Sequence, residues 1–182
     1  MNIPNLLTLL RIFLVPVVVI FLIQGSYVKA LIVFSIAGLT DALDGALARF
    51  LKCQTPLGAF LDPIADKLLI AASFITMSIL GIIPSWLTVI VVSRDFVILL
   101  GIAILTIMSV PYAIKPSLIS KMTTALQIGT IFISLIFQAV TRELTYDWIM
   151  IICWITAFFT VVSGLSYVAR GIKLTNSDSV RK

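Results

Sequence analysis

Six long apolar runs dominate this sequence and decide what it can fold into. Each run is between 17 and 25 residues long, and short stretches of turn-forming or polar residues separate them. A helix needs roughly 20 apolar residues to cross the hydrocarbon core of a bilayer. We therefore predict an all-α integral membrane protein, a bundle of six transmembrane helices. The predicted spans are Leu6–Leu22, Val28–Phe50, Gly58–Ile82, Trp86–Val110, Ile119–Val140 and Trp148–Arg170.

The composition excludes most other classes of protein. Of the 182 residues, 60% are hydrophobic and only 12% are charged, whereas soluble domains carry about 25% charged residues. The two cysteines lie a hundred residues apart and cannot build a disulfide framework or a four-ligand zinc site. The chain has no histidine, which excludes every mechanism that uses an imidazole. The net charge of +5 comes from basic residues between apolar runs, so we expect membrane lipids rather than nucleic acid as the partner.

The distribution of Lys and Arg predicts how the helices are oriented. With the N-terminus inside, nine basic residues lie in the inner loops and ends, and only Lys29 and Arg142 lie outside. Inner loops of membrane proteins carry the excess of basic residues. We therefore expect a multi-pass protein of the inner (cytoplasmic) membrane, with both termini in the cytoplasm. We expect one domain over residues 1–182, in which residues 171–182 form a short solvated cytoplasmic tail.

Five of the eight acidic residues lie inside the apolar runs. A charge at the centre of a transmembrane helix costs about 2.5–3.5 kcal/mol, so intramembrane acids are candidates for function. Four of them fall on two successive runs that share one cytoplasmic loop. On each run the acids are three or four residues apart, which places them on one helix face. The four residues are Asp41, Asp44, Asp62 and Asp66, and the fifth intramembrane acid is Asp95.

Facing carboxylates repel each other in a low dielectric, and either protonation or bound cations relieve the repulsion. Two divalent cations would balance four carboxylates, and all-oxygen ligands favour Mg²⁺ or Mn²⁺ over zinc. Gly45 and Gly58 lie on the same stripes and allow a ligand or a backbone to approach closely. Arg49 ends its stripe, where it can bind a phosphate in a bidentate manner or anchor the helix end at the interface. The pattern indicates a site for a phosphate anhydride.

These residues resemble the motif of the CDP-alcohol phosphatidyltransferase family. The matching stretch is Asp41-x2-Asp44-Gly45-x2-Ala48-Arg49-x8-Gly58-x3-Asp62-x3-Asp66. Its length and number of fixed positions make it far more specific than a short motif. The similarity extends to the six helices and to the start Asn5-Leu-Leu-Thr8-x2-Arg11.

The resemblance implies transfer of a phosphatidyl group from CDP-diacylglycerol to an alcohol, with release of CMP. It implies two divalent cations, Mg²⁺ or Mn²⁺, held mainly by Asp41, Asp44 and Asp62. Asp66 would complete the metal site and act as the base that deprotonates the acceptor hydroxyl. The family also implies a homodimer. The implied contacts of CDP-diacylglycerol are Thr40, Gly45, Ala48, Arg49 and Gly58.

The motif is shared across the family, so the acceptor must be argued from other residues. Glycerol 3-phosphate is a dianion that needs several cations, whereas phosphatidylglycerol carries one diffuse charge. Phosphatidylglycerophosphate synthases of bacteria typically show Gly-Lys-x-Lys-Thr on the fifth helix and a further Arg on the fourth. This chain has one lysine in Ser120-Lys121-Met122-Thr123-Thr124, and Ile102 stands at the position of the further Arg. The candidate acceptor ligands that remain are Arg94 and Lys121.

These departures are similar to the cardiolipin synthases of mitochondrial type and favour phosphatidylglycerol as the acceptor. Glycerol 3-phosphate remains the alternative. The segments that carry this similarity are 37–41, 90–95 and 115–121.

Several polar residues also have structural interpretations. Arg94 and Asp95 are adjacent and point about 100° apart on a helix, so we expect them to pair poorly with each other. Asp95 would then stabilise a neighbouring helix. Lys121 is equally suited to reach the interface as an anchor, and Arg11 is expected to anchor the inner interface. Interhelical hydrogen bonds are a second interpretation for Ser120, Thr123 and Thr124.

A different functional class fits some of the same features. Carboxylates inside a small helical bundle also occur in cation-coupled transporters, where they lie near the midplane in repeat-related halves. In this chain the acids cluster toward one face and the two halves are unlike. A scaffold protein would leave the acids unexplained. Release of CMP and dependence on Mg²⁺ or Mn²⁺ would distinguish the enzyme from both.

Overall fold

The computed structural model is all-helical: the described residues form six α-helices and no strand. It describes residues 3–51, 56–107, 118–140 and 146–179, and the side chains of residues 8–40, 64–101, 118–140 and 148–169. Each helix covers most of one predicted span. The helices are α1 Ile3–Ile23, α2 Tyr27–Leu51, α3 Pro56–Ile79, α4 Ser85–Ile107, α5 Leu118–Val140 and α6 Tyr146–Ser179.

Two glycines end α1 and α3 in the same way. Gly25 and Gly81 have φ angles of 66° and 71°, a left-handed conformation that favours glycine. The residue after each glycine donates its backbone N–H to a carbonyl five residues earlier, from Ser26 to Phe21 at 2.9 Å and from Ile82 to Met77 at 2.9 Å. This pattern satisfies carbonyls that the end of a helix leaves free. The break at Gly25 agrees with the predicted spans, whereas the third helix ends at Ile79 and not at the predicted Ile82, so Gly81 lies outside it.

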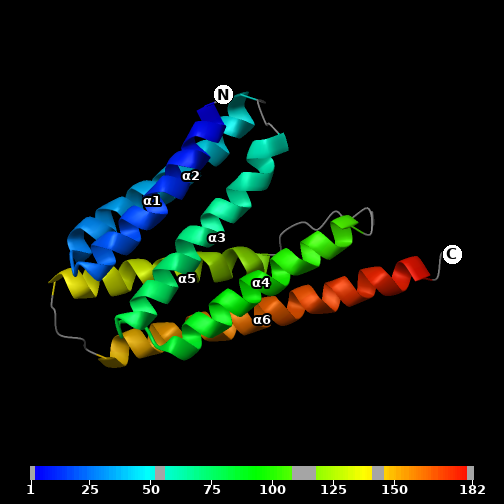
Figure 1. Ribbon diagram of the computed structural model, residues 1–182. Coiled ribbons are helices and arrows are strands. Elements are labelled where there is room, and N and C mark those ends of the chain that lie inside the picture. The colour runs from blue at the N-terminus through cyan, green and yellow to red at the C-terminus, as the bar shows by residue number, and fades with distance from the viewer. Residues whose placement is uncertain (1–2, 52–55, 108–117, 141–145, 180–182) are drawn as a thin grey trace.

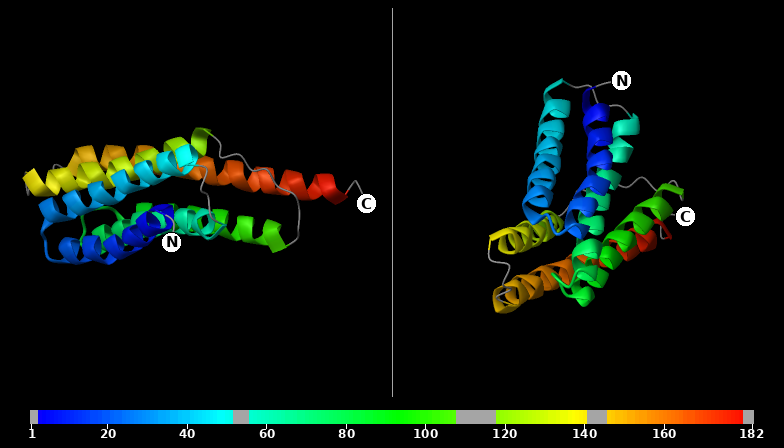
Figure 2. Two further views of the ribbon diagram at one scale, coloured as in Figure 1. Left: turned by 90° about the horizontal axis from the view of Figure 1, so that it is seen from above. Right: turned by 60° about the vertical axis from the view of Figure 1, so that its left-hand side comes forward.

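The helices form two layers, with α1, α3 and α4 in one and α2, α5 and α6 in the other (Figure 2). Neighbouring helices pack in a closed ring in the order α1, α2, α5, α6, α4 and α3, and α3 also touches α5 across the ring (Figure 1). Because α3 contacts α1, α4 and α5, charged residues on different faces of this one helix meet different partners. The candidate site depends on that central position.

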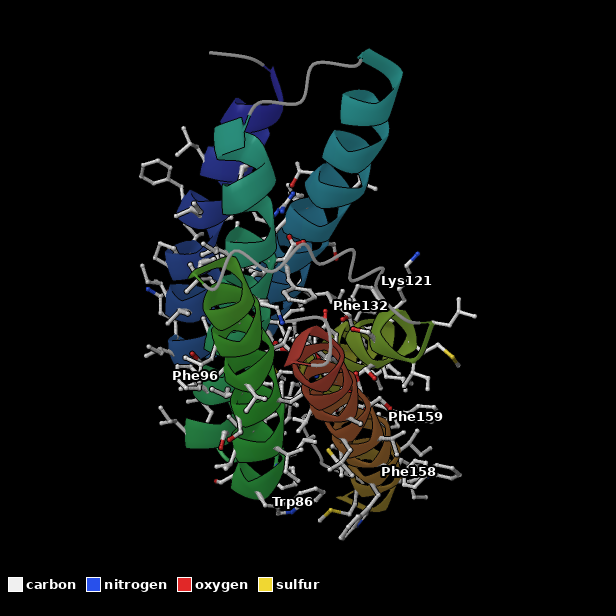
Figure 3. The ribbon with its side chains drawn as sticks, turned by 90° about the vertical axis from the view of Figure 1, so that its right-hand side faces the viewer. Trp86, Phe96, Lys121, Phe132, Phe158 and Phe159 are labelled. Atoms are coloured by element: carbon white, nitrogen blue, oxygen red, sulfur yellow. The ribbon has the colours of Figure 1, made fainter. Side chains whose placement is uncertain are left out.

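The core is apolar, and so is much of the outer surface. Phe74, Met77 and Leu87 are fully buried. Phe96 and Phe158 project from the outside of the bundle (Figure 3) and are about two-thirds exposed, at 64% and 66%. An apolar outer surface of this extent is typical of a protein surrounded by lipid. The chain is thus a helical protein of the membrane type.

Two helices of the described part satisfy length and composition criteria for crossing a bilayer. They are α5, over Leu118–Val140, and the Trp148–Ala169 part of α6. Six complete spans and the orientation of the termini stay predictions.

The last helix is longer than the sequence indicates. We expected the chain to leave its sixth span at Arg170 and continue as a tail, but α6 runs to Ser179. Once a helix exists, each added residue gains a hydrogen bond without a new nucleation cost. No proline interrupts the chain between these two residues. Polar composition predicted the end of the apolar run, which is not the end of the helix.

Candidate active site

The motif residues lie on two helices that meet at the α2–α3 connection. Asp41 and Asp44 belong to α2, whereas Asp62 and Asp66 belong to α3. Of the predicted site residues on these two helices, the structure describes the side chains of Thr40 and Asp66. The predicted site residues whose side chains lie outside the described residues are Asp41, Asp44, Gly45, Ala48, Arg49, Gly58 and Asp62.

Asp66 is held by α1, and its side chain remains partly exposed. Its carboxylate accepts a hydrogen bond and ion pair from Arg11 Nη1 of α1. The Arg11 side chain is only 1% exposed, whereas that of Asp66 is 38% exposed. A buried guanidinium needs a compensating charge, and Asp66 supplies one. The carboxylate is therefore fixed by α1 and still accessible.

The position of Arg11 corrects an expectation. Its place near the start of the first span suggested an anchor at the membrane interface, but it is buried between helices. The reason is the packing of α1 against α3, which turns position 11 toward the interior of the bundle. The pairing with Asp66 joins residues 55 positions apart, so no local pattern in the sequence indicates it.

A small cavity borders this ion pair. Its volume is about 80 Å³, and it lies between α1, α2, α3 and α5. Arg11, Asp66 and the hydroxyl-bearing Thr124 give it a polar side, and the remaining described lining is apolar. The apolar lining residues are Phe34, Ala37, Gly38, Leu69, Ile70 and Ile128.

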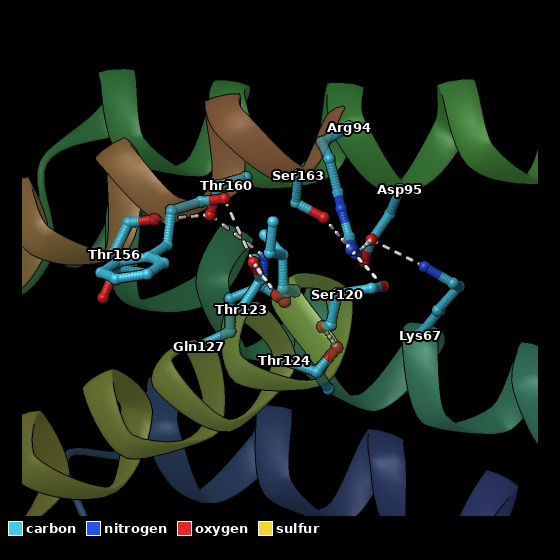
Figure 4. Close-up of polar contacts among 12 residues, drawn as sticks. Lys67, Arg94, Asp95, Ser120, Thr123, Thr124, Gln127, Thr156, Thr160 and Ser163 are labelled. Atoms are coloured by element: carbon cyan, nitrogen blue, oxygen red, sulfur yellow. Dashed lines mark hydrogen bonds and ion pairs between the residues drawn. The ribbon is translucent and has the colours of Figure 1, made fainter. Parts of the chain in front are cut away.

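A second charged cluster surrounds Asp95 on α4. Its Oδ1 atom accepts hydrogen bonds from Lys67 Nζ of α3 and from Arg94 Nη1, both at 2.6 Å (Figure 4). The expectation that Arg94 and Asp95 pair poorly is therefore wrong. The 100° angle between neighbouring residues on a helix applies to the Cα–Cβ bonds. The long Arg94 side chain folds back and brings its guanidinium to the adjacent carboxylate.

Arg94 continues this cluster to two further helices. Its Nη2 atom donates to Ser120 Oγ of α5 at 2.9 Å and to Ser163 Oγ of α6 at 2.8 Å. Gly164 lies against the arginine stem, since a Cβ there would be 3.5 Å from Arg94 Cγ, an ordinary van der Waals contact. The side chains of Arg94 and Asp95 are 5% and 9% exposed. The cluster thus joins four helices in the interior of the bundle.

Hydroxyl groups extend the polar contacts along α5 and α6. Thr130 and Thr156 share a hydrogen bond of 2.7 Å between their Oγ1 atoms. Thr123 Oγ1 donates to the Phe159 carbonyl of α6 at 3.1 Å. Interhelical bonding is confirmed for Thr123 and for Ser120, which binds Arg94. Thr124 instead donates to the Ser120 carbonyl of its own helix at 3.2 Å.

The two candidate acceptor ligands lie in different environments. Arg94 is buried, and both Nη atoms have protein partners. Lys121 is exposed, and its ammonium reaches away from the bundle (Figure 3). The structure therefore does not bring Arg94 and Lys121 together. Thr40, a predicted donor contact, hydrogen-bonds the Ala37 carbonyl of its own helix at 2.8 Å.

The predicted metal ligands form an all-oxygen set of four carboxylates, which suits Mg²⁺ or Mn²⁺. Of these carboxylates, the structure describes only that of Asp66. Among the side chains described, no three acidic, His or Cys residues lie close enough to hold a metal ion. The metal site stays a prediction.

The comparison with protein families decides the class of this chain. The sequence profile described as CDP-alcohol phosphatidyltransferase matches residues 1–162. The chain belongs to this family. It is a phosphatidyltransferase of phospholipid biosynthesis, and not the transporter that its intramembrane acids also allowed.

Curated relatives of this phosphatidyltransferase carry three different names. It is 30% identical to the CDP-diacylglycerol–glycerol-3-phosphate 3-phosphatidyltransferase of Bacillus subtilis, over 93% of this chain and 94% of that protein. It is 35% identical to human cardiolipin synthase (CMP-forming), over 94% of this chain and 62% of that protein. It is also 35% identical to a probable phosphatidylglycerophosphate synthase of Mycobacterium tuberculosis, over 94% of this chain and 82% of that protein. This chain therefore spans less than two-thirds of the human relative, and similarity alone leaves its acceptor open.

Proposed function

We propose that this phosphatidyltransferase uses CDP-diacylglycerol to phosphatidylate phosphatidylglycerol, forming cardiolipin and CMP. The supporting observation is the partly exposed Asp66 side chain beside a cavity whose described lining is mainly apolar. Arg11 is the one cation among the described residues that line the cavity, and Asp66 already offsets its charge. These walls suit a lipid alcohol better than a small dianion, which requires several uncompensated cations.

Asp66 would serve as the base of the transfer. The oxygen of the acceptor hydroxyl bonds to the phosphorus that bears the diacylglycerol group. The bond between that phosphorus and the oxygen of CMP breaks, and CMP leaves with the electron pair. The hydroxyl proton passes to the Asp66 carboxylate. Arg11 keeps that carboxylate in place at the edge of the cavity, so no large rearrangement is needed before the proton moves.

We assign the binding of CDP-diacylglycerol and of the metal ions to the residues of the family motif. Asp41, Asp44 and Asp62, with Asp66, would hold two divalent cations, Mg²⁺ or Mn²⁺. Bound metal would stabilise the charge on the pyrophosphate and on departing CMP. The residues proposed to contact CDP-diacylglycerol are Thr40, Gly45, Ala48, Arg49 and Gly58.

Glycerol 3-phosphate is the second candidate acceptor. The names of the Bacillus subtilis and Mycobacterium tuberculosis relatives support it. Arg94 and Lys121 would be its ligands, but Arg94 would have to release hydrogen bonds to Asp95, Ser120 or Ser163. That requirement favours the lipid acceptor.

The arrangement in the membrane is part of the proposal. We infer one domain over residues 1–182 that crosses the inner membrane six times, with both termini and the nucleotide site at the cytoplasmic face. A homodimer is the proposed assembly. Cysteine labelling from either side of sealed vesicles tests the orientation, and labelling of the α2–α3 connection only from outside the cell would overturn it.

A direct assay decides the acceptor. The purified chain receives CDP-diacylglycerol and Mg²⁺ or Mn²⁺, with phosphatidylglycerol or glycerol 3-phosphate in separate reactions, and both CMP and the lipid product are measured. We expect cardiolipin from phosphatidylglycerol, and loss of CMP release when EDTA removes the metal. Phosphatidylglycerophosphate from glycerol 3-phosphate alone would overturn the proposed acceptor. Full activity in EDTA would overturn the metal requirement.

A further inference from the structure

A larger cavity lies at the end of α2 that is remote from the motif. There the turn between α1 and α2 lies beside the C-terminal end of α5, which is yellow in Figures 1 and 2. The cavity between these segments has a volume of about 270 Å³, and its described lining consists of residues 25–29 with Gln138 and Ala139 of α5. Lys29 precedes Asp41 by 12 residues, which is about 18 Å along a helix. The cavity is therefore separate from the proposed active site.

Every polar side chain in the described lining can donate a hydrogen bond. Ser26 and Tyr27 carry hydroxyl groups, Gln138 carries an amide and Lys29 carries an ammonium group. No carboxylate belongs to this described lining. One cation among several neutral donors suits an anion that offers several acceptor oxygens.

Lys29 supplies the positive charge of this cavity. Its side chain is exposed, and its Nζ atom lies 5.8 Å from the centroid of the Phe21 ring of α1. An aromatic face attracts an ammonium group without neutralising its charge. The structure describes two acidic side chains, Asp66 and Asp95, and both pair with other cations. Among the described residues, the charge of Lys29 therefore has no carboxylate partner and is available to a ligand.

The surroundings of the cavity indicate where such an anion comes from. Ile23 at the end of α1, Val28 of α2 and Val140 at the end of α5 are each more than half exposed. Exposed apolar residues at the ends of helices can pack against the acyl chains of a lipid. Tyr27 adds an amphipathic ring of the kind that lies at the membrane interface. These neighbours favour a lipid headgroup over an anion from solution.

The size of the cavity agrees with a headgroup. One water molecule needs roughly 10–15 Å³ of such space, so a volume of about 270 Å³ holds about 20 heavy atoms. A phosphodiester together with the glycerol groups on either side of it falls within this limit. Free phosphate would leave most of the cavity unfilled.

We propose that this cavity binds the phosphodiester of an anionic membrane phospholipid, with the phosphate beside Lys29. Phosphatidylcholine carries the same phosphate, but its ammonium group finds no carboxylate in the described lining. An anionic lipid with a neutral headgroup is therefore preferred. The bound lipid joins the α1–α2 turn to α5, and a ligand that binds only the folded chain raises its stability.

Binding is tested with phosphatidylmethanol, which has the monoanionic phosphodiester but no hydroxyl group and cannot act as an acceptor. The full chain is purified in a neutral detergent, and the rise of its unfolding midpoint with lipid concentration gives the dissociation constant. We expect saturable binding of phosphatidylmethanol, and at least tenfold weaker binding of phosphatidylcholine and of inorganic phosphate. Equal binding of phosphatidylcholine would overturn the preference for an anionic lipid. Equal binding of inorganic phosphate would overturn a lipid as the ligand.

Substitution of two exposed lysines locates the binding. Lys29→Gln should weaken the binding of phosphatidylmethanol about fivefold, which is the contribution of one basic residue near an anionic lipid surface. Lys29→Arg keeps the charge and should stay within twofold of the wild type. Lys121 is also exposed, but it precedes Gln138 by 17 residues on α5, so Lys121→Gln should change binding less than twofold. No weakening in Lys29→Gln, or equal weakening in both Gln variants, would overturn the site.

A neutral substitution tests the contribution of α5. Gln138→Leu removes an amide donor without changing the charge, and we expect about threefold weaker binding. An unchanged constant would overturn the placement of the phosphate between α2 and α5. Unfolding of each variant without lipid confirms that it is folded. The outcome is independent of the proposed acceptor, because no transfer reaction enters the measurement.

Discussion

Two consecutive residues of α3 carry opposite charges and take part in two very different clusters. Asp66 pairs with Arg11 of α1, and its side chain remains 38% exposed beside the cavity. Lys67 pairs with Asp95 of α4, inside a network in which Asp95 and Arg94 are less than a tenth exposed. Both clusters contain a buried arginine and an aspartate. What distinguishes them is that one leaves a carboxylate accessible, whereas the other directs its donors to protein partners on four helices.

This contrast separates a candidate for chemistry from a candidate for stability. A base must reach a substrate proton, which the accessible Asp66 can do. A charge enclosed by partners instead fixes the helices that carry it, and removing one partner leaves another charge uncompensated. The variants below test whether accessibility divides the two roles.

The largest effect is expected from Asp66→Asn. An amide does not accept the hydroxyl proton, and loss of a general base lowers rates by about 10²- to 10⁴-fold. We therefore expect a fall of that size in kcat, measured as CMP release, while CDP-diacylglycerol still binds in an equilibrium binding assay. Turnover near the wild-type rate would remove Asp66 from the role of base.

The same substitution in the enclosed cluster should act on stability. Asp95→Asn leaves the charges of Lys67 and Arg94 without their carboxylate, and breaking a buried ion pair costs about 3–5 kcal/mol. We expect a large fall in the unfolding midpoint and a kcat within tenfold of wild type at a temperature where the variant is folded. Adding Lys67→Met should restore part of the stability, as a double-mutant cycle would measure. An unchanged midpoint would contradict a structural role for this network.

The sequence was sufficient to predict where the helices lie. It also predicted which two of them carry the motif. Apolar runs identify a helix in a membrane because every backbone group must find its partner within the segment. Gly25 marks the end of α1 as predicted, because its conformation is local, whereas α3 ends at Ile79, before Gly81 and before the predicted end at Ile82. The end of α6 was missed, since helix continuation past Arg170 depends on backbone hydrogen bonds and not on hydrophobicity.

The partners of the charged residues were not predictable in the same way. Arg11 lies 55 residues from Asp66, and its burial depends on how α1 packs against α3. The pairing of Arg94 with Asp95 depends on a side-chain conformation that helix periodicity does not describe. The sequence did indicate that intramembrane charges are special. It did not indicate which of them the packing would leave accessible.

A substitution of Arg11 tests the Arg11–Asp66 pair through the arginine instead of the aspartate. Arg11→Met removes the group that positions the base, and a small misplacement of a catalytic group can lower a rate by about 10²-fold. We expect kcat to fall about 10- to 100-fold with both KM values within threefold. Arg11→Lys should recover part of the rate, because it keeps the charge but loses the fork geometry.

A buried residue on the same helix supplies the control for Arg11. Val18 of α1 is 1% exposed and belongs to the apolar core. Val18→Ala should lower the unfolding midpoint by loss of packing without changing kcat. A parallel fall of kcat in Val18→Ala and Arg11→Met would mean that Arg11 acts only through the stability of α1.

The smallest effect is expected where α5 and α6 contact each other through neutral groups. Thr130→Val removes the hydrogen bond of 2.7 Å to Thr156 while nearly preserving the side-chain shape. Hydrogen bonds between transmembrane helices contribute about 0.6 kcal/mol on average, so the unfolding midpoint should fall slightly and kcat should not change. The double variant with Thr156→Val should add little, because the first substitution already removes the shared bond. Thr130→Val could instead destabilise the chain as much as Asp95→Asn. Enclosure of charge would then not be the reason why the cluster around Asp95 stabilises the bundle. The division between the two clusters would then have to be explained by helix packing alone.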